Sequence, residues 1–207
     1  MISSHFSLHP LRRTARAAAV ISAAAALVLA LGASHWAGAA TRPAYGGGFT
    51  FKMVRTPGVP CLSKAGGSVT ITKGSLNDKM TVSVHGLPAK TGFDLFVLQL
   101  PNKPFGVAWY QTDIETNSKG EGSATVVGVF SKETFSVSLG GTATFSPTHQ
   151  YHLGLWFNEP SVPFKLHCEG AATAPIVTPF NGEQHAGIQI LNTSNFPDAK
   201  GPLSHVS

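Results

Sequence analysis

Three oxygen-bearing side chains at alternate positions, Asp113, Glu115 and Asn117, have the spacing with which a loop can hold a calcium ion. A calcium loop of the helix-loop-helix type also needs Gly at its sixth position and Glu at its twelfth, where this chain has Ser118 and Ala124. A polar hairpin tip accounts for the same residues. We therefore predict an exposed turn here, and we expect neither a metal nor a cofactor.

A second candidate for metal binding is the pair His149 and His152. Residues three apart in a strand point to opposite faces, so the two could share a metal only if His149 lay in the preceding turn. Cys168, beside His167, could also be a ligand, but no further ligands stand at a convincing spacing. We expect these histidines to lie at the surface or to be hydrogen-bonded.

Hydrolytic chemistry would require an activated nucleophile. The sequence has no Gly-x-Ser-x-Gly turn, and its Ser, His and acidic residues are scattered without a recognisable frame. We therefore assign no catalytic residue. A small secreted hydrolase, with a site assembled from scattered polar residues, is the alternative function.

Two aromatic pairs, Trp109-Tyr110 and Trp156-Phe157, offer surfaces for binding. Alternate residues of the second segment form an apolar stripe: Tyr151, Leu153, Leu155 and Phe157. Trp156 then lies on the other face with His152 and Asn158, where it could stack on a sugar or on a partner's side chain. Alternatively it packs beneath a loop, such as segment 178–184, or against the second sheet, and this packing interpretation is the one we favour. The candidate ligand-binding residues are Trp156, His152, Asn158 and Trp109.

These residues lie on short segments with a two-residue hydrophobic period, which predicts strands. The predicted strands are 49–54, 68–72, 79–85, 93–100, 106–115, 123–130, 133–139, 141–145, 150–157 and 185–191. Segment 93–100 is apolar on both faces, which is typical of a central strand. It begins three expected successive antiparallel strands, the last two joined by a turn at 117–120. The pattern predicts an all-β fold, an antiparallel β-sandwich.

Residues 84–97 resemble the strand-turn-strand stretch of fibronectin type III and related immunoglobulin-like domains. In that family a loop containing Leu-Pro, here Leu87-Pro88, leads to an aromatic residue that opens a central strand, here Phe93. Phe93 stands where the family has a tyrosine that donates the corner hydrogen bond. The resemblance implies a sandwich corner. More broadly, the chain resembles uncharacterised exported bacterial β-sandwich proteins, and that resemblance implies no particular function.

The first 39 residues have the pattern of a signal peptide. Three arginines precede an apolar run at 17–31, and Ala37-Gly38-Ala39 matches a cleavage site. The run is shorter than the roughly 20 residues needed to span a bilayer, so we expect no membrane span after cleavage. Residues 40–48 would be a flexible leader, and residues 49–207 a single domain with an irregular tail from about 192.

Cleavage would remove three of the 15 basic residues and no acidic one, leaving 12 against 10 and a net charge of +2. The mature chain has no basic run, so we expect no nucleic-acid partner. Cys61 and Cys168 are an isolated pair, and in an exported chain such a pair predicts a disulfide. We expect a secreted or cell-surface, non-catalytic binding or structural protein, for which a cell-surface glycan or protein is a candidate partner.

Overall fold

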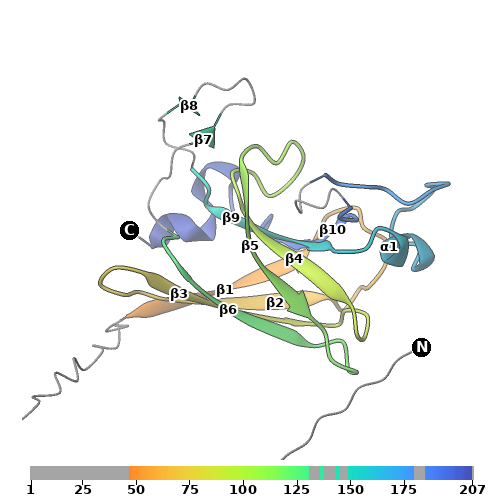
Figure 1. Ribbon diagram of the computed structural model, residues 1–207, viewed down its shortest axis with the longest axis horizontal. Helices are drawn as coiled ribbons and strands as arrows, with labels where there is room; N and C mark the ends of the chain where they lie inside the picture. Colours follow the sequence, from red (N-terminus) through yellow and green to blue (C-terminus); the bar gives the residue numbers. More distant parts are fainter. Residues whose placement is uncertain (1–46, 131–135, 138–142, 145–148, 180–184, 207) are drawn as a thin grey trace, which may run out of the picture. The chain divides into compact units, whose positions relative to one another are not determined.

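The computed structural model describes residues 47–130, 136–137, 143–144, 149–179 and 185–206 (Figure 1). The expected signal peptide at 1–39 and nearly all of the expected leader lie outside these residues. None of the helices within the described ranges has the length and apolar character needed to cross a membrane.

The described residues contain ten strands, and each overlaps a segment predicted from its two-residue period. They are β1 (Gly48–Arg55), β2 (Gly66–Thr72), β3 (Asp78–His85), β4 (Gly92–Leu98), β5 (Ala108–Glu115), β6 (Gly122–Gly128), β7 (Ser136–Val137), β8 (Ala143–Thr144), β9 (His152–Phe157) and β10 (Gln189–Asn192). Every pairing between them is antiparallel. The predicted all-β antiparallel fold is therefore confirmed.

Eight of the described strands form one sheet in the order β5-β4-β9-β10-β1-β2-β3-β6, while β7 and β8 pair separately (Figure 1). Strands β5 and β6 stand at opposite ends of this order but are joined by the short turn at 117–120. The sheet is consequently nearly closed. The expected series of three successive paired strands is correct for β4 and β5 but wrong for β6, whose hydrogen-bonded neighbour is β3. A two-residue period identifies a strand but does not specify its partner.

Most of the buried apolar side chains form one main core. It combines residues of β1, β2 and β3 with residues of β4, β9 and β10. The predicted stripe on β9 lies here, with Leu153, Leu155 and Phe157 fully buried and Tyr151 packed against them. Phe93 of β4 packs on Phe157 with their ring centroids 4.9 Å apart. The interior face of β9 was thus predicted correctly from its sequence.

A smaller group of buried side chains lies on the opposite face of β4 and β9. This outer cluster consists of Phe96, Leu98, Phe105, Trp156 and Ala186. Strand β4 contributes to both groups, which confirms the expectation that it is buried on both faces.

Strand β1 belongs to two pairings in succession. Residues 48–53 pair with β2, and the last two residues, Val54 and Arg55, pair with β10. The backbone N–H of Thr56 continues this second pairing by donating to the carbonyl oxygen of Ile190, at 2.9 Å. One strand therefore connects the group β2-β3-β6 to the group β10-β9-β4-β5.

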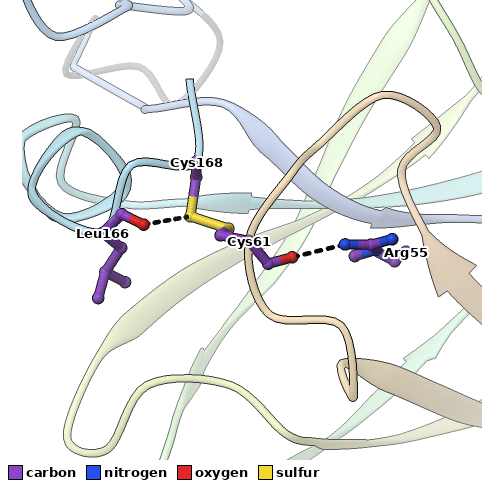
Figure 2. The surroundings of a disulfide bond; sticks show 4 residues. All are labelled: Arg55, Cys61, Leu166 and Cys168. Carbon is purple, nitrogen blue, oxygen red and sulfur yellow. Dashed lines mark hydrogen bonds between the residues drawn. A yellow bond between two sulfur atoms is a disulfide. The ribbon is translucent and has the colours of Figure 1, made fainter. Parts of the chain in front are cut away.

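The predicted disulfide is present. Cys61, in the connection from β1 to β2, is bonded to Cys168, which follows the short helix α1 (Ser161–Lys165), with a Cα–Cα distance of 4.8 Å (Figure 2). Arg55 donates from its guanidinium to the Cys61 carbonyl oxygen at 2.8 Å. The Leu166 carbonyl oxygen lies 3.9 Å from the Cys168 Sγ, which carries no proton to donate once oxidised. The bond fastens the β1–β2 connection to the segment after β9.

The chain after β10 forms two short 3-10 turns, η1 (Asp198–Lys200) and η2 (Pro202–His205). This segment is irregular but packed, because Leu203 and Val206 are buried in the main core. The Leu203 backbone N–H donates to the Tyr151 carbonyl oxygen at 3.0 Å. The end of the chain thereby covers one end of β9.

Candidate binding cavity

Trp156 is the centre of the candidate site. Its side chain is 1% exposed, and its ring meets those of Phe105 and Phe96 edge to face, at centroid distances of 5.0 and 5.4 Å. Phe105 comes from the connection between β4 and β5. The favoured interpretation, that Trp156 packs beneath other parts of the chain, is therefore correct, while residues 180–184 of the loop suggested for it lie outside the described residues. The covering residues include Phe105 and Ala186.

Beside Trp156 lies a cavity of about 540 Å³. Five segments far apart in the sequence surround it: the turn after β1, the β4–β5 connection, β9 at Trp156, the chain from Cys168 to Thr178, and residues 188–189. Its described lining residues are Thr56, Pro57, Gly58, Val59, Asn102, Lys103, Phe105, Trp156, Cys168, Glu169, Ile176, Thr178, Ile188 and Gln189. This volume lies in the range that ligand-binding pockets occupy, roughly 300–1,000 Å³. We call it the binding cavity.

A bulge in β10 shapes the inner end of the binding cavity. Gln189 pairs with Trp156, but Leu191 pairs with Leu155, so Ile190 is an extra residue in the ladder. The extra residue lets Ile190 and Leu191 both enter the main core. It also turns the following residue, Asn192, to the same face as Gln189.

The side-chain amides of Gln189 and Asn192 then form a directed hydrogen-bond network. Asn192 Nδ2 donates to the carbonyl oxygen of Pro101 at 3.0 Å and to Gln189 Oε1 at 2.9 Å. Thr56 Oγ1 donates to the same Gln189 oxygen at 3.2 Å. The network fixes the orientation of the Gln189 amide, since a carbonyl oxygen can only accept. Gln189 Nε2 is consequently left on the far side of this network.

Two buried polar atoms of cavity-lining residues lack hydrogen-bond partners in the described part of the chain: Gln189 Nε2 and Glu169 Oε1. Gln189 is only 5% exposed. The other carboxylate oxygen of Glu169 accepts the backbone N–H of Ile176 at 3.1 Å, which holds the side chain in place. A buried polar atom without a partner costs about 1–3 kcal/mol. Both atoms are out of reach of solvent, so a ligand in the cavity would touch other atoms of these two residues.

The binding cavity carries little catalytic chemistry. Its described lining residues include no histidine and no serine, and Glu169 is their only carboxylate. Cys168 is held in the disulfide and cannot act as a nucleophile. Neither a nucleophile with its base nor a pair of carboxylates is therefore assembled among these residues.

Comparison with models of known protein families and with the sequences of curated proteins finds no match.

The four residues that were predicted from the sequence to bind a ligand do not form one site. Trp156 lines the binding cavity. His152 is fully buried and is hydrogen-bonded through Nδ1 to Thr193 Oγ1 at 2.9 Å and through Nε2 to the Asp198 carbonyl oxygen at 3.0 Å. Burial, opposed by the hydrogen bond to Asp198, lowers the pKa of His152 below its ordinary value of 6.5.

The other two nominated residues lie on different strands or strand ends. Asn158 follows β9 and donates from Nδ2 to Asp94 Oδ1 at 3.2 Å. Trp109 is 59% exposed on β5, a strand with one hydrogen-bonded neighbour among the described strands. Next to it, Tyr110 donates its hydroxyl to Asp113 Oδ1 at 2.9 Å. Partial burial, and then this hydrogen bond, raise the pKa of Tyr110 to about 12.

The two candidate metal sites are not supported by the geometry. His149 is exposed next to Tyr151, whereas His152 is buried, and no group of three or more metal-ligating side chains occurs within the described ranges. The calcium-like spacing ends in a turn, where Asn117 Oδ1 accepts the backbone N–H groups of Lys119 and Glu121. Asn117, Ser118 and Lys119 are exposed, as predicted for a hairpin tip, while Gly120 is buried.

Sequence reasoning missed Gln189, Glu169 and Phe105. One signal was available for Gln189, which is the polar residue between Ile188 and Ile190 in the predicted strand 185–191. Glu169 follows Cys168 directly, so the predicted disulfide already placed it near the β1–β2 connection. Phe105 lies in a loop and has no periodic pattern that could reveal its contact with Trp156.

Proposed function

We propose that this protein is an exported, non-catalytic binding protein that holds a small ligand in the binding cavity. The observation that carries the proposal is the cavity of about 540 Å³, whose described lining brings the buried rings of Trp156 and Phe105 together with the side chains of Gln189 and Glu169. An apolar wall that includes Trp156 and Phe105, with a few placed polar groups, is typical of ligand sites. Hydrogen bonds to Thr56 and Asn192 hold Gln189 in place, and a lining that is already ordered favours binding.

Export is supported by two features. The disulfide between Cys61 and Cys168 fits an oxidising compartment. The segment at 1–39 has the charge, apolar run and small-residue motif of a signal peptide. On this proposal the ligand is met outside the cytoplasm, either free or as part of a cell-surface glycan or protein.

We also infer a β-sandwich arrangement of the sheet, with an immunoglobulin-like corner at residues 84–97. Support comes from the main core, which takes side chains from β1-β2-β3 on one side and from β4-β9-β10 on the other. In a sandwich the inner faces of two strand groups supply one common core. Phe93, the aromatic residue of the resemblance, lies in that core.

The test is a ligand screen with a narrowed cavity. Ile176 lines the cavity and is 37% exposed, so replacing it by Trp should narrow the cavity while leaving the fold intact. Leu166 is 38% exposed and is not among the lining residues, which makes Leu166→Trp the matched control. Thermal unfolding would be measured with monosaccharides, polyols, amino-acid amides, choline, acetate and an apolar dye as probes.

We expect at least one probe to raise the melting temperature of the native protein and of Leu166→Trp, but not that of Ile176→Trp. A ligand at 100 times its dissociation constant stabilises a folded protein by about 2.7 kcal/mol, which is readily measured. Equal shifts in both variants would place binding elsewhere and overturn the proposal. The absence of a shift with every probe would overturn it too.

A further inference from the structure

We propose that the C-terminal segment, residues 193–206, is a strap across one end of the main core that acid releases, and that the neutral imidazole of His152 holds it closed. This part of the molecule lies apart from the binding cavity, because none of residues 193–206 is among the described lining residues. The proposal therefore stands independently of the proposed function.

The C-terminal segment is attached to the start of β9. The backbone N–H of Thr193 donates to the carbonyl oxygen of Leu153 at 3.2 Å, and that of Leu203 donates to the carbonyl oxygen of Tyr151 at 3.0 Å. Leu203 and Val206 place their side chains in the main core. Detachment of the segment would uncover this end of the core, while the ladder between β9 and β10, which ends before the segment, can remain formed.

His152, the first residue of β9, reaches the C-terminal segment at two points. Its Nδ1 lies 2.9 Å from Thr193 Oγ1, and its Nε2 lies 3.0 Å from the carbonyl oxygen of Asp198. The ring also lies close to Gly201, where an added Cβ would be 2.8 Å from Cδ2. The side chain of His152 is fully buried. One imidazole thus connects the first residue of the segment to η1 and packs against the glycine that follows η1.

The hydrogen bonds around this ring suit the neutral imidazole. A carbonyl oxygen can only accept, so Nε2 carries the proton that is donated to Asp198. Nδ1 of the neutral ring is then an acceptor, and the Thr193 hydroxyl donates to it. The same Thr193 oxygen accepts the backbone N–H of Leu153 at 3.1 Å. Each of these protons has its own acceptor.

A second proton on the ring would disturb this arrangement. On Nδ1 it would point at Thr193 Oγ1, whose own proton would have to turn to the carbonyl oxygen of Leu153, 3.5 Å away. That oxygen already accepts the backbone N–H of Thr193. The charge of the ring would also be buried beside a hydroxyl and a carbonyl group instead of a carboxylate, which is costly. Burial accordingly lowers the pKa of His152 below its ordinary 6.5.

The charges around the ring do not reverse this effect. The ionisable residues of the elements that pack against it are Asp198 and Lys200 in η1, His205 in η2, Asp94 in β4, and His149 and Tyr151 just before β9. The hydrogen bond to Asp198 and the charge of Asp198 favour the protonated ring, but burial opposes it more strongly. Acid therefore favours the released state, in which His152 regains its ordinary pKa.

The experiment measures amide hydrogen exchange by NMR, corrected for the intrinsic rate at each pH, from about pH 7.5 to 5.5. His152→Gln keeps a donor for the Asp198 carbonyl and an acceptor for the Thr193 hydroxyl but has no group that titrates. His205→Gln removes the exposed histidine of the C-terminal segment itself and is the matched control. The titration of the His152 ring is followed by NMR in the native protein.

We expect the amides of Thr193 and Leu203 to open at a lower free energy than the slowest amides of β2 at about pH 7.5. Their opening equilibrium should rise by up to about tenfold for each pH unit between 6.5 and the pKa of the folded His152, because the open state binds one more proton there. The rise should persist in His205→Gln and disappear in His152→Gln.

Opening free energies equal to those of β2 would mean that the C-terminal segment detaches only when the whole domain unfolds, and would overturn the proposal. A rise that persists in His152→Gln, or that disappears in His205→Gln, would overturn it as well. If His152→Gln does not fold, the native protein decides. There the opening of the Thr193 and Leu203 amides must follow the titration of the His152 ring, and a ring that titrates at its ordinary pKa while the segment stays closed would refute the release.

Discussion

Gln189 lies directly opposite Trp156 in the antiparallel pair formed by β10 and β9. Both side chains leave the sheet on the face that carries the binding cavity, one as a fixed amide and the other as a buried ring. Between them there is no room for another side chain, because a Cβ added to Gly154 would collide with the Trp156 ring and the Gln189 amide. The positions of Trp156 and Gln189, which both line the cavity, thus depend on the absence of a side chain at residue 154.

Replacing Trp156 by Ala should lower the free energy of unfolding by about 3–5 kcal/mol, the usual cost of removing a fully buried aromatic side chain. Trp109 is 59% exposed and provides the control, since Trp109→Ala should change stability by no more than about 0.5 kcal/mol. Urea denaturation of both variants measures the difference. Equal effects of the two substitutions would contradict the packing described for Trp156.

Removing the disulfide should be costly because it closes a loop of 107 residues. Loop-closure entropy predicts a loss of about 4–5 kcal/mol for the double variant Cys61→Ala, Cys168→Ala. Titration of the unfolded, unreduced protein should detect no free thiol. Two free thiols, or a double variant as stable as the native protein, would refute this prediction.

His152 should make the fold sensitive to acid. Its pKa is lower in the folded state than the ordinary 6.5, so the unfolded chain binds more protons between these two values. The contribution of this residue is therefore fully present above about pH 6.5 and is lost as the pH falls toward the folded pKa. Melting temperatures from pH 8 to 4 should decline less steeply in His152→Gln. The exposed His149, replaced in the same way, controls for loss of a surface histidine, and an unchanged profile in His152→Gln would contradict the prediction.

Calcium should leave the melting temperature unchanged. Asn117 Oδ1 already accepts two backbone N–H groups of its own turn, and Asp113 already accepts the Tyr110 hydroxyl. These oxygens therefore already accept hydrogen bonds that stabilise the hairpin tip and its neighbouring strand. Thermal unfolding with calcium chloride, compared with the same concentration of magnesium chloride, measures the effect. A calcium-specific rise of several degrees would show that a site is completed there.

The sequence alone predicted what local periodicity determines. Alternation along β9 identified which of its faces enters the main core, because successive side chains in a strand point to opposite sides. The cysteine pair was predicted from chemistry and compartment. The pairing partner of β6 was not predicted. Two strands with the same alternation of apolar and polar residues are equally suitable as partners until long-range packing distinguishes them.

The binding cavity could not be predicted for a related reason. Gln189 and Glu169 are 20 positions apart, and Phe105 precedes Trp156 by 51 positions. Their meeting depends on loops, on the disulfide and on the bulge in β10. None of these produces a regular pattern in the sequence, and a bulge in particular cancels the alternation from which faces are inferred.

The division of β1 between two partners has a consequence for how the protein opens. Because six of its residues pair with β2 and the last two with β10, neither group of strands can detach without disturbing the same short strand. Native-state hydrogen exchange should then find one cooperative unit, with the slowest amides of β2 and β9 exchanging at the same free energy of opening. The walls of the cavity would in that case be lost only when the whole domain unfolds.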